Sequence, residues 1–142
     1  MEVSSHDLER LPVDNLRVSR AEFAAVRQAA ERRSAQETRR HVTDWHAGGV
    51  VVTCRWLAQA AHAGDASGRL ERSPVTERLA RADAERIEEE CLAAERLLLR
   101  RPRPAWLQAR PGWIEAVVAT FDWAWRGTGS PPLPPGGGAG LI

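Results

Sequence analysis

Two tryptophan-containing segments constrain the fold of this chain more than any other feature. The first covers residues 45–57 and reads WHAGGVVVTCRWL, and the second covers residues 113–123 and reads WIEAVVATFDW. Aligning the valines of the two segments places Gly49 and Thr53 on Ala116 and Thr120. Small residues four apart allow two helix backbones to approach closely. We therefore predict that the two segments are the central core helices of a small helical domain.

The first tryptophan segment also has a rival interpretation as a strand. Gly48, Gly49 and the three valines lower its helix propensity, so residues 50–54 could instead form a short strand. The helix is favoured because one apolar stripe recurs every three or four residues and continues beyond the valines. That stripe comprises Trp45, Gly49, Val52, Trp56 and Ala60.

Two polar helices are expected beside the tryptophan helices. Ser19 and Glu22 form a capping-box pattern, which predicts a helix from there to about residue 41. Ser73 followed by Pro74 is typical of a helix start and predicts a long third helix over about 73–100. Its apolar stripe is expected to comprise Ala80, Ala84, Ile87, Cys91, Ala94 and Leu98. The second tryptophan helix is expected over about 111–126.

These elements predict an all-α, single-domain, four-helix arrangement of two helical hairpins, with an internal duplication of the tryptophan helices as a further hypothesis. In that duplication Arg55 and Asp122 hold equivalent places and are expected to pair. Residues 1–18 are expected to form a partly ordered N-terminal arm and residues 19–127 the helical domain. Residues 128–142, rich in proline and glycine, are expected to be a disordered tail.

Composition excludes several classes of function. The chain of 142 residues is 43% apolar and 27% charged, as in an ordinary globular domain, and no apolar run approaches the length of a membrane helix. The N-terminus lacks a signal peptide, so we expect a cytoplasmic protein without membrane contact. The net charge of +1 gives no global field that would attract nucleic acid. Arginine without any lysine is typical of a GC-rich bacterial genome and weakens arguments from arginine richness.

The sequence lacks the residue spacings that are typical of zinc sites and of catalytic motifs. The available metal ligands lack the spacing of a zinc site, so we expect no cofactor; they are His41, His46, Cys54, His62 and Cys91. The polar groups of the tryptophan segments are more simply explained as helix caps and ion pairs than as an acid–base pair; they are Asp44, His46, Glu115 and Asp122. A small enzyme or ligand-binding protein, with a pocket beside Gly48 and Gly49, is therefore only our third hypothesis.

Six tryptophans in a small chain favour protein–protein contact, as a homodimer or as a subunit or adaptor of a larger assembly. Tryptophan and arginine are enriched at protein interfaces, and a chain of this size is not expected to bury all six indoles. The contact region is expected around residues 101–113 and the tryptophan helices. The predicted interface comprises Arg101, Arg103, Trp106, Trp113 and Trp125.

The alternative function is nucleic-acid binding by two arginine clusters. Arginines can neutralise phosphates, and Trp106 could stack on a base. The sequence shows no compact helix-turn-helix that would support this alternative. The predicted contacts are Arg32, Arg33, Arg39, Arg40, Arg100, Arg101, Arg103 and Arg110. The two functions can be separated by asking whether these arginines gather on one part of the surface or pair with the acidic third helix.

Overall fold

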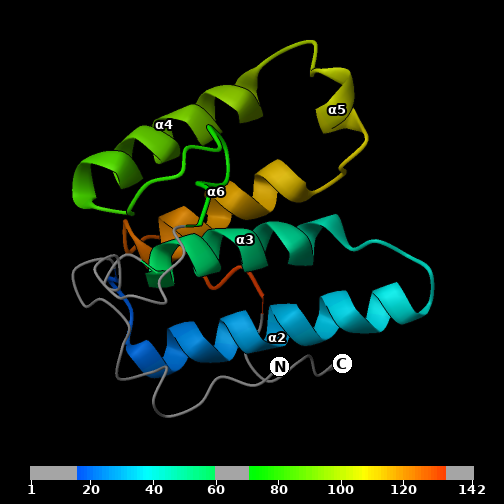
Figure 1. Ribbon diagram of the computed structural model, residues 1–142, viewed down its shortest axis with the longest axis horizontal. Helices are drawn as coiled ribbons and strands as arrows, with labels where there is room; N and C mark the ends of the chain where they lie inside the picture. Colours follow the sequence, from blue (N-terminus) through cyan, green and yellow to red (C-terminus); the bar gives the residue numbers. More distant parts are fainter. Residues whose placement is uncertain (1–15, 60–70, 134–142) are drawn as a thin grey trace.

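The computed structural model describes residues 16–59 and 71–133 and confirms an all-α fold (Figure 1). Its helices are α2 (Arg20–Arg39), α3 (Trp45–Gln59), α4 (Ala84–Leu99), α5 (Ala105–Gln108) and α6 (Trp113–Ala124). Within these ranges, β structure is limited to an isolated bridge between Arg72 and Leu79. The described part of the chain has one helix more than the predicted four, because α5 forms within the expected link. No helix in the described ranges is long and apolar enough to cross a membrane.

The four longer helices are stacked in the order α2, α3, α6 and α4 (Figure 1). α3 packs against α2 on one side and most extensively against α6 on the other, and α4 packs against α6. Each polar helix therefore lies beside one tryptophan helix. The internal duplication stays a prediction. The ion pair expected from it is absent, because the Arg55 side chain instead pairs with Glu71, with an Nε–Oε1 distance of 3.5 Å.

The central contact is a close approach of α3 and α6 at small residues. A Cβ atom placed on Gly49 would lie 2.7 Å from the Trp113 carbonyl oxygen and 2.9 Å from the Ala116 Cβ. Thr53 and Thr120 are fully buried, and each hydroxyl donates to the carbonyl four residues earlier, at 2.8 and 2.7 Å respectively. These intrahelical hydrogen bonds satisfy both hydroxyls without an interhelical partner, so the two backbones can meet over an otherwise apolar contact.

α2 confirms the capped, narrow-faced helix that the sequence predicts. The Ser19 hydroxyl accepts a hydrogen bond from the Glu22 N–H at 3.1 Å and also contacts the Glu22 carboxylate. This contact differs from the usual capping box, in which the carboxylate reaches the backbone of the capping residue. Phe23, Val26 and Ala30 are fully buried. Phe23 stacks on Trp123 of α6 with ring centroids 6.3 Å apart, so α2 reaches the second tryptophan helix as well as α3.

α3 is helical through residues 50–54, so the strand alternative is wrong. Its predicted stripe is wrong at Val52, which is 36% exposed, and Ala60 lies outside the described residues. The buried positions are Ala47, Gly49, Val50, Thr53, Cys54, Trp56, Leu57 and Ala58. They cover more than one face because α3 lies between α2 and α6. A central helix needs a broad apolar surface, and a single stripe underestimates it.

The predicted start of the third helix, with Ser73 as its cap and Pro74 as its first residue, is wrong, because α4 begins ten residues later, at Ala84. Residues 74–76 form a turn, and Glu77 has a positive φ of 57° that ends it. The Ser73 hydroxyl accepts the Arg78 N–H at 3.0 Å and therefore caps this turn. Asp83 caps α4, accepting the Arg86 N–H at 2.9 Å.

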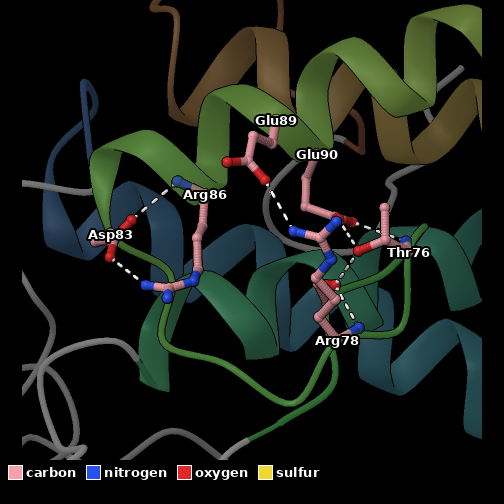
Figure 2. A network of polar contacts seen from close by, with 7 residues as sticks. Thr76, Arg78, Asp83, Arg86, Glu89 and Glu90 are labelled. Carbon is pink, nitrogen blue, oxygen red and sulfur yellow. Dashed lines mark hydrogen bonds and ion pairs between the residues drawn. The ribbon is translucent and has the colours of Figure 1, made fainter.

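Glu90 of α4 explains why the chain turns at Ser73 and Pro74 instead of starting a helix (Figure 2). One oxygen of its buried carboxylate accepts the N–H groups of Val75 and Thr76 at 2.8 and 3.2 Å, and the other contacts the Thr76 hydroxyl. These N–H groups would need such acceptors at a helix start too, so the same local sequence suits either structure. On the predicted stripe, Ile87, Cys91 and Ala94 are buried, whereas Ala84 is exposed.

Both ends of the described chain pack onto the helices. Leu16 is buried, and the Arg17 N–H donates to the Ala124 carbonyl at 2.7 Å. Beyond α6, Leu133 is buried, and the Pro132 carbonyl lies 3.0 Å from His46 Nε2. Pro132 and Leu133, which belong to the predicted tail, therefore contact the helices. The rest of that tail, residues 134–142, and residues 1–15 of the arm lie outside the described residues.

Candidate interaction surface at the α5 end

α5 is a single helical turn that buries one side chain and presents its neighbour to solvent. Leu107 is 1% exposed and anchors the turn in the core, whereas Trp106 is 46% exposed. The segment is held from both sides, because the Gln108 side chain donates to the Arg103 carbonyl at 2.7 Å and the Arg110 N–H donates to the Leu107 carbonyl at 3.0 Å. Trp106 is thus a large apolar side chain on a fixed piece of backbone.

Three tryptophans surround the Arg110 side chain next to this turn. The guanidinium carbon lies 5.4 Å from the ring centroids of Trp45 and Trp106 and 5.6 Å from that of Trp113. The rings of Trp106 and Trp113 themselves meet edge to face at 6.2 Å. A cation within about 6 Å of an aromatic face is attracted to it. The cluster brings together residues of α3, α5 and α6.

The backbone around Arg110 makes this cluster possible. The Arg110 carbonyl accepts the Trp113 N–H at 3.1 Å, and Gly112 has a φ of 88° immediately before α6. A positive φ is readily adopted only by glycine, and it turns the chain sharply into the helix. A Cβ atom on Gly112 would lie 3.5 Å from the His46 Cβ, so the turn packs directly on the start of α3.

Exposed side chains at the end of α4 extend this region. Leu99 is 76% exposed, and Arg100 and Arg101 are also exposed. Arg101 donates only to nearby carbonyls, those of Leu98 and Arg100, at 2.9 and 2.7 Å. We define the tryptophan–arginine surface as Leu99, Arg100, Arg101, Trp106 and Arg110. It combines exposed apolar area with cationic groups.

The predicted interface residues do not all belong to this surface. Trp106 and Arg101 belong to it. Trp113 is only 6% exposed, and its ring packs edge to face against that of Trp106. Trp125 follows the other end of α6, where its indole N–H donates to Glu88 at 3.1 Å and the Arg17 guanidinium covers its ring at 4.4 Å. The structure therefore does not bring Trp125 together with Trp106.

Arg103 lies at the same end but is held in an ion pair. Its guanidinium donates to the Glu115 carboxylate at 2.8 Å. Partial burial raises the pKa of Glu115, but the hydrogen bond and charge of Arg103, with a smaller effect of Arg101, outweigh it and leave this pKa below its ordinary value. Glu115 therefore stays ionised at neutral pH and neutralises part of the local positive charge.

Elements that carry predicted nucleic-acid contacts share one end of the long axis (Figure 1). The C-terminal end of α2, the N-terminal end of α6 and the segment around α5 all lie there. Several of these arginines are engaged locally: Arg33 with Asp44 at 2.7 Å, Arg40 with Glu37 at 3.7 Å, and Arg103 with Glu115. The exposed remainder comprises Arg32, Arg39, Arg100 and Arg101. In the described structure none of the eight forms an ion pair with α4, whose acids contact Arg78 and Arg126.

The groups considered for catalysis or ligand binding beside Gly48 have structural partners. The Asp44 carboxylate accepts the Ala47 N–H at 2.9 Å, capping α3, and also pairs with Arg33. His46 contacts the Pro132 carbonyl, and a Cβ on Gly48 would meet open space. Within the described ranges, no three His, Cys, Asp or Glu side chains are grouped as metal ligands. His62 lies outside those ranges.

The contact region predicted from the sequence, residues 101–113 and the tryptophan helices, includes Trp45 and Arg110, but neither is among the individually predicted interface residues. Leu99 was given no role. A local signal for Arg110 did exist, because Pro111 and Gly112 predict a turn that folds the chain back before the second tryptophan helix. The contact of Arg110 with Trp45 had no local signal, since it depends on how α3 packs against α6.

Comparison of this chain with protein-family models, with curated proteins and with solved structures found no match.

Proposed function

We propose that this protein acts by binding another protein through the tryptophan–arginine surface, and that the bound partner segment is acidic. The observation that carries the proposal is Trp106. It is the most exposed of the six tryptophans, all of which lie in described ranges, and it stands on a backbone held by Leu107 and the Arg110 turn. A rigid, exposed tryptophan gives a large contact area at a low cost in conformational entropy.

The charge around Trp106 supports an acidic partner. Arg100 and Arg101 are exposed in the segment that leads from α4 to α5, and the acids Asp44 and Glu115 are already paired with other arginines. Surface arginines that form no ion pair in the described structure favour encounter with a negatively charged segment and add specificity to the apolar contact. A second copy of this chain is the other occupant to consider, since α4 carries exposed acids at the opposite end of the molecule, among them Glu85 and Glu88.

Peptide selection tests the proposal and does not require the partner protein itself. A displayed random-peptide library is selected on the immobilised chain and on two variants. The wild type is expected to enrich peptides that combine Asp or Glu with an apolar side chain, and Trp106→Ala is expected to lose them. Leu92→Ala is the matched control, because Leu92 is similarly exposed, at 47%, but lies in the middle of α4. Enrichment of the same peptides by Trp106→Ala would contradict the proposal.

Nucleic-acid binding is retained as a second candidate because of one observation: elements that carry the predicted arginine contacts share one end of the molecule, and none of these arginines in the described structure forms an ion pair with α4. Size-exclusion chromatography with light scattering, with absorbance read at the protein and nucleic-acid maxima, separates the two candidates. Phosphate contacts weaken steeply with salt. Nucleic acid that co-elutes at low salt and dissociates at high salt would favour the second candidate. A dimer free of nucleic acid would make a second copy the partner.

A further inference from the structure

Arg110 differs from the other arginines at its end of the molecule in how it is held. It is half-buried against three indoles, and its backbone N–H and carbonyl are both fixed by hydrogen bonds to Leu107 and Trp113. Holding the side chain in place removes part of the entropy that an arginine loses when it binds a ligand. The guanidinium is therefore preorganised.

The hydrogen-bonding capacity of this guanidinium is unused. A guanidinium carries five N–H donors. Nowhere in residues 16–59 or 71–133 does a group accept a hydrogen bond from the Arg110 side chain, and the carboxylates of Asp44 and Glu115 are bonded to Arg33 and Arg103. Contact with the rings uses the positive charge but leaves the N–H groups available, because an aromatic face is only a weak acceptor.

We propose that Arg110 is the anchor of the tryptophan–arginine surface and that it binds a carboxylate of the partner, an aspartate or glutamate side chain. The inference rests on the proposed function and names the group that the surface recognises. A carboxylate matches the fork of a guanidinium with two parallel hydrogen bonds. Partial burial between indoles lowers the local dielectric and strengthens such a pair relative to one in water.

The surroundings favour a carboxylate on a protein over a phosphate of nucleic acid. Trp106 and Leu99 offer apolar contacts to the side chains that flank an acidic residue in a peptide. Two of the arginines predicted to contact phosphates, Arg33 and Arg103, are engaged in ion pairs. Three indoles around a cation also form the kind of cage that holds quaternary ammonium ligands. Here the Arg110 guanidinium already occupies that cage, so we expect the site to bind an anion through the N–H groups of Arg110 and not a cation.

The test measures the affinity of the full chain for a fluorescein-labelled hexaglutamate peptide by fluorescence anisotropy. Arg110→Gln removes the charge and the fork and is expected to weaken binding by about tenfold or more, as removal of one partner of a partly buried charge pair does. Arg110→Lys keeps the charge without the fork and is expected to weaken binding less, by about threefold to tenfold. Arg39→Gln is the control for charge alone, since Arg39 is exposed at the same end, and should change the affinity by less than about threefold.

Two results would overturn the inference. One is equal hexaglutamate affinity for the wild type and both Arg110 variants. The other is tighter binding of labelled hexathymidine than of hexaglutamate, which would assign the site to phosphate. Circular dichroism and unfolding midpoints check that each variant is folded. If Arg110→Gln is not folded, the hexaglutamate affinities of Arg110→Lys and the wild type decide the test. An unchanged peptide selection by Trp106→Ala contradicts the proposed function, whereas an unchanged affinity in the Arg110 variants contradicts this inference alone.

Discussion

At the scale of single residues, Gly48 and Gly49 are neighbours in α3 with opposite surroundings. A Cβ on Gly48 would meet nothing within 4 Å, whereas a Cβ on Gly49 would lie 2.7 Å from a backbone carbonyl of α6. Backbone cannot move aside as a flexible side chain can, so the two positions should respond differently to the same substitution.

Gly49→Ala is expected to lower the free energy of unfolding by about 1–3 kcal/mol, because the overpacking at the α3–α6 contact outweighs the gain in helix propensity. Gly48→Ala is the matched control and is expected to raise that free energy by about 0.5–1 kcal/mol through helix propensity alone. Urea unfolding of the two variants measures both. Equal effects in the two variants would show that the helices do not meet closely at Gly49.

The Asp44 carboxyl, at the start of α3, is expected to make the stability of the fold depend on pH. Burial raises the pKa of this carboxyl, but the Ala47 N–H and the Arg33 guanidinium outweigh it, so the pKa lies below its ordinary value of 3.8. A pKa that is lower in the folded than in the unfolded state stabilises the fold above the unfolded value, and this stability is lost as the pH falls through the folded value.

Asp44→Asn tests this dependence, because asparagine still caps a helix but carries no charge. The variant is expected to be less stable than the wild type at pH 7. The difference should shrink as the pH falls below 3.8 and should also shrink in high salt. Thermal unfolding across the acidic range measures it, and a difference that is independent of pH would exclude the charge of Asp44 as its cause.

At the scale of elements, Glu90 holds the turn at residues 73–79 against α4 (Figure 2). Glu90→Ala would leave the N–H groups of Val75 and Thr76 and the Thr76 hydroxyl without their acceptor, so a loss of about 3 kcal/mol in unfolding free energy is expected. Glu89→Ala is the control, since its ion pair with Arg78 is exposed and should contribute less than about 0.5 kcal/mol. Urea unfolding compares the two, and a loss in Glu90→Ala no larger than that in Glu89→Ala would contradict this role of Glu90.

The same turn shows which elements could be predicted from the sequence. α2, α3 and α6 were found because their signals are local: the Ser19 cap and the repeated indoles and small residues. The turn at Ser73 and Pro74 was not predicted, because Glu90, which holds it, lies 15 residues beyond the Val75 N–H that it accepts. α5 has only four residues, too few to show a period. Trp106 and Arg101 could be predicted from composition, but the position of Arg110 required the packing of α3 on α6.

At the scale of the whole molecule, Cys54 and Cys91 report on the integrity of the core. Cys54 is fully buried and Cys91 is 2% exposed, and burial raises the pKa of each thiol to about 12. Only the thiolate reacts readily, so both thiols should be inert in the folded chain. Titration with a thiol-specific reagent is expected to show two reactive groups only in denaturant, and rapid reaction without denaturant would contradict the packing of the core.

From the arrangement of charge and apolar area along the molecule, we propose that a partner binds at the end bearing α5. Nuclear magnetic resonance tests this by recording the six indole N–H resonances while a peptide enriched by the wild type in the library selection is added. The signals of Trp45, Trp106 and Trp113 are expected to shift, while those of the core residues Trp56 and Trp123 are not. Shifts confined to Trp125 at the opposite end of α6, or no shift at saturating peptide, would contradict it.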